Sequence, residues 1–199
     1  AGIHPHYASS WGESTQASLE ELIQLPYIRA IGECGLDFNR NFSTHEEQIH
    51  TFEKQIDLAI KYQKPLFMHQ RDAHDNFINC IKNKRSQFTK GVVHCFTGTE
   101  DELNDYLDLD LHIGLTGWIC DERRGFHMHK FIPKIPLNRL MIETDAPYLT
   151  PRNMKPRPSR NEPAFLTYIV EQLADIYQRS SAEIANETES TTKEFYNLD

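Results

Sequence analysis

The sequence has little cysteine, and the four that occur are Cys34, Cys80, Cys95 and Cys120. They form no CxxC pair and follow no regular spacing. This pattern argues against a disulfide framework and favours free thiols in a reducing cytoplasm. We therefore expect a cytoplasmic protein.

Long apolar runs are also missing. No stretch approaches the roughly 18 uninterrupted apolar residues of a membrane-spanning helix, which excludes a membrane partner. No charged-then-apolar leader is visible, so nothing argues for export. The sequence lacks an initiator methionine and opens on Ala1 within an apolar run. We therefore expect residues 1–199 to form a single barrel domain that is incomplete at its N-terminus.

Positive charge is scarce, with 21 Lys and Arg against 29 Asp and Glu and a net charge of −8. This balance is a poor match for a polyanion, because non-specific nucleic-acid binding relies on Lys and Arg at phosphates. A local basic stretch offsets the deficit, and it holds Arg152, Lys155, Arg157 and Arg160. Arg123 and Arg124 form a second basic pair. The stretch is either a solvated loop or a guide for a nucleic-acid backbone.

Strand-like and helix-like stretches alternate along the chain. The predicted strands cover residues 28–33, 65–69, 91–94, 111–116 and 139–144. The predicted helices cover residues 14–25, 44–64, 72–84, 100–108 and 126–132, with two more after the Pro- and Arg-rich connection 147–163. Capping boxes start two of the helices, Thr44 with Glu47 and Ser180 with Glu183. Such alternation implies parallel strands, in either a (β/α) barrel or an open doubly wound sheet.

Acid or imidazole side chains end four of the predicted strands, and they are Glu33, His69, His94 and Asp145. The carboxyl ends of barrel strands converge on one point, whereas an open sheet concentrates its site between two strands. The pattern therefore favours an α/β TIM (β/α)8 barrel. Such a barrel has eight strands. Five are predicted with a partial one ending near His4, which places two strands before Ala1.

The same four side chains suit a divalent metal, because carboxylates and imidazoles together accommodate Mg²⁺, Mn²⁺ or Zn²⁺. The alternative is that the histidines are core residues and the acids cap helices. Glu143 competes with Asp145, since both share one face of a regular strand. Asp37 is placed to cap a loop beside the site.

Six ordered segments carry a family resemblance. They are residues 2–6 (GIHPH), 30–38 (AIGECGLDF), 67–73 (FMHQRDA), 93–99 (VHCFTGT), 142–148 (IETDAPY) and 160–163 (RNEP). Together they resemble the TatD family of metal-dependent deoxyribonucleases over essentially the whole chain. The resemblance implies a TIM barrel that hydrolyses phosphodiester bonds, as a Mg²⁺-dependent 3′–5′ exonuclease on single-stranded DNA. RNA as a substrate and a role in DNA repair or degradation are further expectations.

The resemblance also implies roles for single residues. Glu33 matches the metal-binding, bridging glutamate, and His69 and His94 match the histidine ligands. Asp145 matches the aspartate that holds metal and accepts a proton from the attacking water. Glu33 and Asp145 are thus the expected catalytic pair. The family's first-strand metal-binding segment, commonly His-x-His, has no counterpart in these 199 residues.

A second set of residues is expected to contact the substrate: His4, His6, Arg71, Arg152 and Arg160. Trp118 and Tyr148 are the candidates to stack on a base. No obligate protein partner is inferred. Two other interpretations stay open, namely a related metal-dependent hydrolase acting on amides, lactones or bases, and an inactive truncated fragment that only binds nucleic acid.

Overall fold

The computed structural model describes residues 1–198. The chain divides into two compact units, Ala1–His94 with Asp108–Leu111, and Cys95–Leu107 with the chain from His112 onward. The single domain over residues 1–199 stays a prediction. All four cysteines are free thiols, as expected. No helix within residues 1–198 has the length and apolar character needed to cross a membrane.

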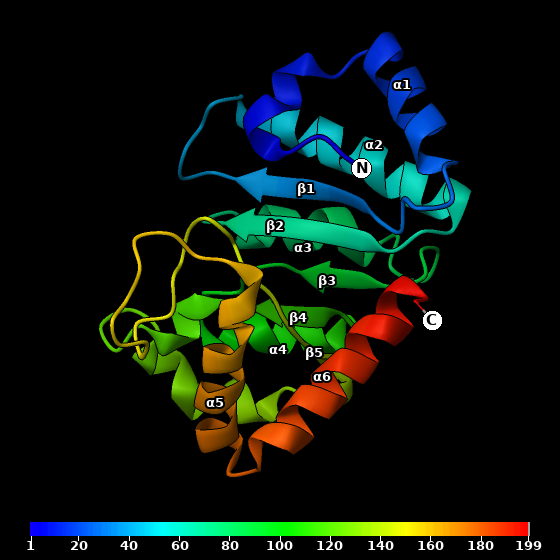
Figure 1. Cartoon of the computed structure of the whole chain (residues 1–199). Helices are drawn as coiled ribbons and strands as arrows, with labels where there is room; N and C mark the ends of the chain where they lie inside the picture. Colours follow the sequence, from blue (N-terminus) through cyan, green and yellow to red (C-terminus); the bar gives the residue numbers. More distant parts are fainter. Residues whose placement is uncertain (199) are drawn as a thin grey trace. The chain divides into compact units, whose positions relative to one another are not determined.

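The first unit holds three parallel strands and the helices that connect them (Figure 1). Its elements are η1 (Pro5–Ser10), α1 (Glu13–Ile23), β1 (Ile31–Asp37), α2 (His45–Tyr62), β2 (Leu66–Arg71), α3 (His74–Lys82) and β3 (Gly91–Val93). β1 pairs with β2, and β2 pairs with β3. This order is the one that alternating strands and crossover helices predict.

Two aromatic rings dominate the core of this unit. Phe52 on α2 and Phe77 on α3 are fully buried and stack with their centroids 5.2 Å apart. Strand residues Leu36 and Met68 are also fully buried. Burying each such side chain stabilises the unit by about 1.5–3 kcal/mol. The buried apolar residues of α2, among them Phe52 and Ile56, therefore form its core-facing side.

The capping box at the start of α2 is present as predicted. Thr44 accepts a hydrogen bond from the Glu47 N–H, and Glu47 accepts one from the Thr44 N–H. We expect Thr44→Ala to lower the free energy of unfolding by about 1 kcal/mol, because the substitution leaves a helix N–H without its acceptor. Urea unfolding measures this loss, and Ser180→Ala at the equivalent box of α6 provides the matched comparison. An unchanged urea midpoint in both variants would contradict the assignment.

The second unit begins with α4 and ends with two long helices. Its elements are α4 (Glu100–Asp108), β4 (His112–Leu115), η2 (Gly117–Cys120), η3 (Phe126–Lys130), η4 (Ile132–Lys134), η5 (Leu137–Arg139), β5 (Leu140–Ile142), η6 (Pro163–Phe165), α5 (Leu166–Tyr177) and α6 (Ser181–Tyr196). β4 pairs with β5 in parallel. On α5, the Tyr177 hydroxyl donates to the carbonyls of Ile132 and Ile135, which fastens this helix to η4 and the residue that follows it.

The helix predicted around residues 126–132 is wrong. Two short 3-10 helices, η3 and η4, occupy the region instead. Apolar residues there do recur at helical spacing, and Phe131 and Ile132 are buried. Pro133 and Pro136 follow at once, however, and proline removes the N–H that an α-helix needs in its interior.

Two predicted strand ends are also wrong. β1 runs on to Asp37 and β2 runs on to Arg71, so Glu33 and His69 lie inside strands. His94, in contrast, directly follows β3 as predicted. Five strands are described within residues 1–198, where a closed barrel of this type has eight. The α/β class therefore agrees with the prediction, and the barrel is not closed by these strands.

Candidate metal centre

A β-bulge sets the position of Glu33. Gly32 pairs with Phe67 and Cys34 pairs with Met68, so Glu33 is an extra residue without a partner on β2. A bulge bends its strand and re-aims the side chain of the inserted residue. The neighbouring Cys34 is fully buried, as expected for a packing residue.

Glycine allows the two strands to approach at this bulge. Gly35 has φ +132°, and a Cβ there would lie 2.0 Å from the carbonyl oxygen of His69. Gly32 has φ +153°, and its Cβ would lie 2.3 Å from the carbonyl oxygen of Phe67. Any larger residue would push β1 from β2. The close approach brings the side chains of Glu33 and His69 together.

Buried polar side chains on α2 hold the N-terminal segment against β1. The Gln55 side chain accepts a hydrogen bond from the Ile3 N–H at 2.7 Å and donates to the Ile3 carbonyl at 3.0 Å. Thr51 donates to the carbonyl of Ala8 at 3.1 Å. The sequence analysis missed both residues. The available signal was two polar residues lying four apart within the apolar face of a helix.

Four side chains meet at this end of the first unit. His69 Nδ1 lies 3.0 Å from Glu33 Oε1, within hydrogen-bond distance. His4 Nε2 lies 3.6 Å from the same oxygen, and His94 Nε2 lies 3.9 Å from it. Donor atoms of His4, Glu33 and His69 all fall within 4.8 Å of one another. One glutamate oxygen is therefore the common neighbour of three imidazoles.

His4 is the least suited of the three to bind a metal. Its Nδ1 accepts a hydrogen bond from the His6 N–H at 3.1 Å. An imidazole that accepts at one nitrogen carries its proton on the other, so Nε2 is the N–H that faces Glu33. His4 thus faces Glu33 with an N–H at 3.6 Å, just beyond hydrogen-bond distance. The expected substrate contact of His4 stays a prediction.

Asp37 is a buried carboxylate that lies next to the His6 and His69 rings of the cluster. It is 1% exposed, and its Oδ1 accepts from the backbone N–H groups of Asn39 and Arg40. Its Oδ2 accepts from His6 Nε2 at 2.8 Å and lies 3.3 Å from His69 Nε2. Asp37 therefore caps the loop after β1, as the sequence predicts. A carboxylate behind a histidine is also the usual arrangement at metal sites.

The electrostatics of the cluster favour a positive charge at its centre. Burial would raise the pKa of Glu33, but its interactions with the His4, His69 and His94 imidazoles hold that pKa below its usual range. The pKa of Asp37 is lowered in the same way, because the effect of burial is outweighed by the nearby His69 ring and by hydrogen bonds from the Arg40 N–H and His6. Burial would lower the pKa of His69, but both carboxylates raise it to about 9. A bound cation satisfies the same demand.

These residues fit a divalent metal. His69 Nε2 is buried 3.3 Å from Asp37 Oδ2, so it can carry the N–H of the ring and leave Nδ1 unprotonated as a ligand beside Glu33. The 3.0 Å between His69 Nδ1 and Glu33 Oε1 suits two ligands of one ion whose metal–ligand distances are about 2.0–2.2 Å. Mixed carboxylate and imidazole donors accommodate several first-row metals and Mg²⁺.

Asp145 and Arg160 belong to the second unit, and Arg71 belongs to the first. Asp145 follows β5 by three residues. Its competitor Glu143 accepts a hydrogen bond from the Cys95 N–H at 2.7 Å, which gives it a structural role. Arg71 is exposed at the end of β2, and Arg160 is exposed in the loop after β5. The ligand role of Asp145 and the substrate contacts stay predictions.

Comparison with known proteins identifies relatives along the whole chain. The family model for TatD related DNase matches residues 1–197. A protein of Erwinia tasmaniensis named 3′-5′ ssDNA/RNA exonuclease TatD is 48% identical over 200 aligned positions, which cover 100% of this chain and 77% of the relative. A protein of the same name from Edwardsiella piscicida shows the same identity and the same coverage.

Solved structures agree with this relationship. A TatD homologue from Escherichia coli K12 has a TM-score of 0.88 and 27% identity, covering 100% of this chain and 76% of that one. A TatD family hydrolase from Entamoeba histolytica has a TM-score of 0.82 and 29% identity, covering 98% and 73% of the two chains. The predicted α/β fold of TIM-barrel metal hydrolases is thereby confirmed, and the family implies a divalent metal. The chain belongs to the TatD related DNase family of hydrolytic nucleases.

Proposed function

We propose that this protein is a metal-dependent exonuclease that removes nucleotides from the 3′ end of single-stranded DNA and RNA. The observation that carries the proposal is the convergence of Glu33, His69 and His94 at one point, in a chain that belongs to a nuclease family. Relatives at 48% identity are named 3′-5′ ssDNA/RNA exonuclease TatD, which supports the polarity and the substrate.

The proposed metal ligands are Glu33, His69 and His94, with Asp145 as a further one from the family resemblance. Mg²⁺ is the proposed ion, and Mn²⁺ and Zn²⁺ are the alternatives. A bound divalent cation polarises a phosphate oxygen and lowers the pKa of bound water. Asp145 takes up the proton of the attacking water as general base.

Several neighbouring residues act by positioning the ligands. Asp37 lies behind His69 and orients its ring. His4 faces Glu33 with its Nε2 at 3.6 Å and favours the orientation of this carboxylate toward the cluster. His6 fixes Asp37 and has 27% of its side chain exposed, which is compatible with contact to a substrate.

Arg71, Arg152 and Arg160 are the proposed phosphate contacts, because a guanidinium binds phosphate with two parallel hydrogen bonds.

An end-labelled oligonucleotide tests this function. With Mg²⁺ present, a 5′-labelled single strand should shorten stepwise, whereas a 3′-labelled one should release its label as a mononucleotide at once. EDTA should stop both reactions. Cleavage of internal bonds first would contradict the polarity. The absence of any cleavage with Mg²⁺, Mn²⁺ or Zn²⁺, with the same protein still folded by circular dichroism, would contradict the function.

The place of action is part of the same proposal. Four free thiols support a reducing compartment, and we propose the cytoplasm. A role in DNA repair or degradation stays a prediction. Neither point affects the chemistry at Glu33.

A further inference from the structure

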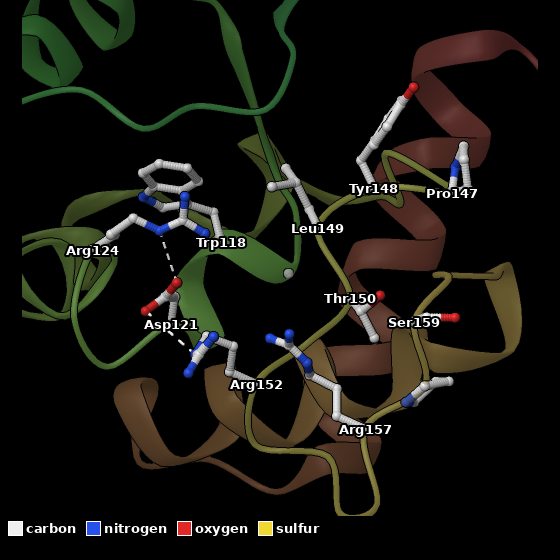
Figure 2. Close-up of a pocket in the computed structure, with 12 residues that line it drawn as sticks. Trp118, Asp121, Arg124, Pro147, Tyr148, Leu149, Thr150, Arg152, Arg157 and Ser159 are labelled. Atoms are coloured by element: carbon white, nitrogen blue, oxygen red, sulfur yellow. Dashed lines mark hydrogen bonds and ion pairs between the residues drawn. The ribbon is translucent and has the colours of Figure 1, made fainter.

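A cavity opens in the second unit between η2 and the loop that follows β5. It has a volume of about 360 Å³ and is lined by both segments (Figure 2). The residues that give it chemical character are Trp118, Asp121, Arg124, Tyr148, Arg152 and Arg157. The metal cluster of the first unit contributes none of them.

Positive charge exceeds negative charge in this lining. Asp121 is 1% exposed and forms ion pairs with Arg124 at 2.8 Å and with Arg152 at 3.7 Å. One buried carboxylate thus organises two guanidinium groups. Arg157 adds a third and makes no hydrogen bond or ion pair with residues 1–198. The lining therefore carries three arginines against one aspartate in a chain whose net charge is −8.

The lining also holds buried donors without acceptors. Trp118 Nε1 is buried and has no hydrogen-bond acceptor within the described part of the chain. Arg152 Nε is also buried and makes only ion pairs outside hydrogen-bond geometry, with Asp121 at 3.7 Å and Glu122 at 3.5 Å. A buried N–H without an acceptor costs about 1–3 kcal/mol. Figure 2 shows the Arg152 guanidinium directed toward Asp121, and the Arg157 side chain extending toward Arg152 from the other side. These groups match a ligand that brings oxygen acceptors and negative charge, as a phosphate does.

An aromatic surface stands at the edge of the same cavity. Tyr148 is 69% exposed. The Trp118 ring is already covered on one side by Arg124, whose guanidinium carbon lies 4.2 Å from the ring centroid. Tyr148 is therefore the ring with a face open to a ligand. Stacking on an aromatic side chain is the usual way in which proteins hold an unpaired base.

The loop that carries Tyr148 is firmly fixed. Asn161 is 5% exposed and donates to the carbonyls of Tyr148 at 2.8 Å and Leu149 at 3.3 Å. On the opposite wall, a Cβ at Gly117 would lie 2.1 Å from the Leu149 carbonyl oxygen, so the loop reaches η2 only because this residue is glycine. The loop that carries Tyr148 is therefore held in place by these contacts with Asn161 and Gly117.

We propose that this cavity binds one nucleotide unit of a single-stranded nucleic acid. Arg152 and Arg157 hold a phosphate of the strand, and the Trp118 N–H donates to the same phosphate. The base stacks on Tyr148. This inference rests on the proposed nuclease function and specifies how its substrate is held. In this inference Arg157, and not Arg160, is the phosphate contact that joins Arg152, because Arg157 lines the cavity and Arg160 does not.

Binding without turnover tests the inference. A short fluorescent oligothymidylate is titrated with the protein in EDTA, and anisotropy gives the dissociation constant at several salt concentrations. Arg157→Gln should weaken binding about tenfold and reduce the salt slope by about 0.7, because one phosphate contact is lost. Tyr148→Ala should weaken binding about tenfold through lost stacking, with an unchanged salt slope.

Two matched variants serve as controls. Arg179→Gln removes the same charge from an exposed position of the second unit, and Tyr27→Ala removes a side chain that is 71% exposed in the first unit. Both should bind within about twofold of wild type, since neither residue lines the cavity. Unchanged binding by both Arg157→Gln and Tyr148→Ala would overturn the inference. So would displacement of the oligonucleotide by inorganic phosphate at equal concentration.

The outcomes separate this inference from the function on which it rests. In one outcome, the wild-type protein degrades the oligonucleotide with Mg²⁺ and the two cavity variants bind and degrade it normally. This result would support the nuclease function and show that the cavity does not hold the substrate. A wild-type protein that neither binds nor degrades single strands contradicts both. Weakened binding in both cavity variants with normal controls supports both.

Discussion

Replacing Glu33 with glutamine should reduce nuclease activity at least about a hundredfold, because even residues behind metal ligands contribute 10- to 100-fold. Glu33 Oε1 is the shared neighbour of His4, His69 and His94, at 3.6, 3.0 and 3.9 Å. Glutamine keeps the shape of the side chain but is neutral, so the cluster loses a negative charge that a cation requires. The measurement is kcat/KM on a labelled single strand, with metal affinity obtained by calorimetry on the same sample.

The matched control for this variant is Glu53→Gln. Glu53 is exposed on α2 in the same unit, and the substitution makes the same chemical change away from the cluster. Its activity should stay within about twofold of wild type, as surface substitutions rarely matter. If Glu33→Gln retained wild-type activity and metal affinity, the carboxylate would have no part in the site.

Asp37→Asn should produce the second large effect, and it should act on stability and on metal binding together. Asp37 accepts hydrogen bonds from His6, Asn39 and Arg40 while 1% exposed. Hydrogen bonds to a charged group contribute about 1.5–3 kcal/mol each, so we expect about 2 kcal/mol less stability. Loss of the carboxylate behind His69 should lower metal affinity by about 10- to 100-fold.

Urea unfolding and calorimetric metal titration measure the two effects of this substitution. Asp175→Asn provides the comparison, since Asp175 is exposed on α5 in the other unit and is not one of the residues that form the cluster. Normal metal affinity in Asp37→Asn, with reduced stability, would assign this residue to folding alone. Rescue of affinity in Asp37→Glu would strengthen the positioning role.

Local signals in the sequence predict much of this fold. The capping boxes at Thr44 and Ser180 depend on residues three apart, and both are present. The apolar stripes of the helices follow from spacing alone. The stretch 126–132 shows the limit of spacing, because prolines just beyond it decide against a helix.

The arrangement of the site depends on contacts that no local pattern reveals. Glu33 is aimed by a bulge whose existence depends on how β1 pairs with β2, some thirty residues further along the chain. His4 reaches Glu33 because Gln55 on α2 holds the backbone of Ile3. Sequence patterns predict that acids and imidazoles gather, and they misplace Glu33 and His69 within their strands.

The basic stretch at residues 152–160 is a second case in which the sequence predicts the kind of contact but not which residues make it. Its composition predicts contact with a nucleic acid, and Arg152 does line a cavity. Composition cannot tell that Arg157 joins the lining while Arg160 does not, because the path of a proline-rich loop decides which side chains turn inward. Arg124 reaches the same lining from the second basic pair through its ion pair with Asp121.

The most direct test of the central claim is the position of a bound metal. Crystals grown with Mn²⁺ and measured for anomalous scattering should show an ion in contact with the Glu33 carboxylate and the His69 imidazole, at metal–ligand distances of about 2.0–2.3 Å. The peak should disappear in crystals of Glu33→Gln grown under the same conditions. Wild-type crystals without an anomalous peak beside these two side chains, at a Mn²⁺ concentration that supports full nuclease activity, would contradict the account.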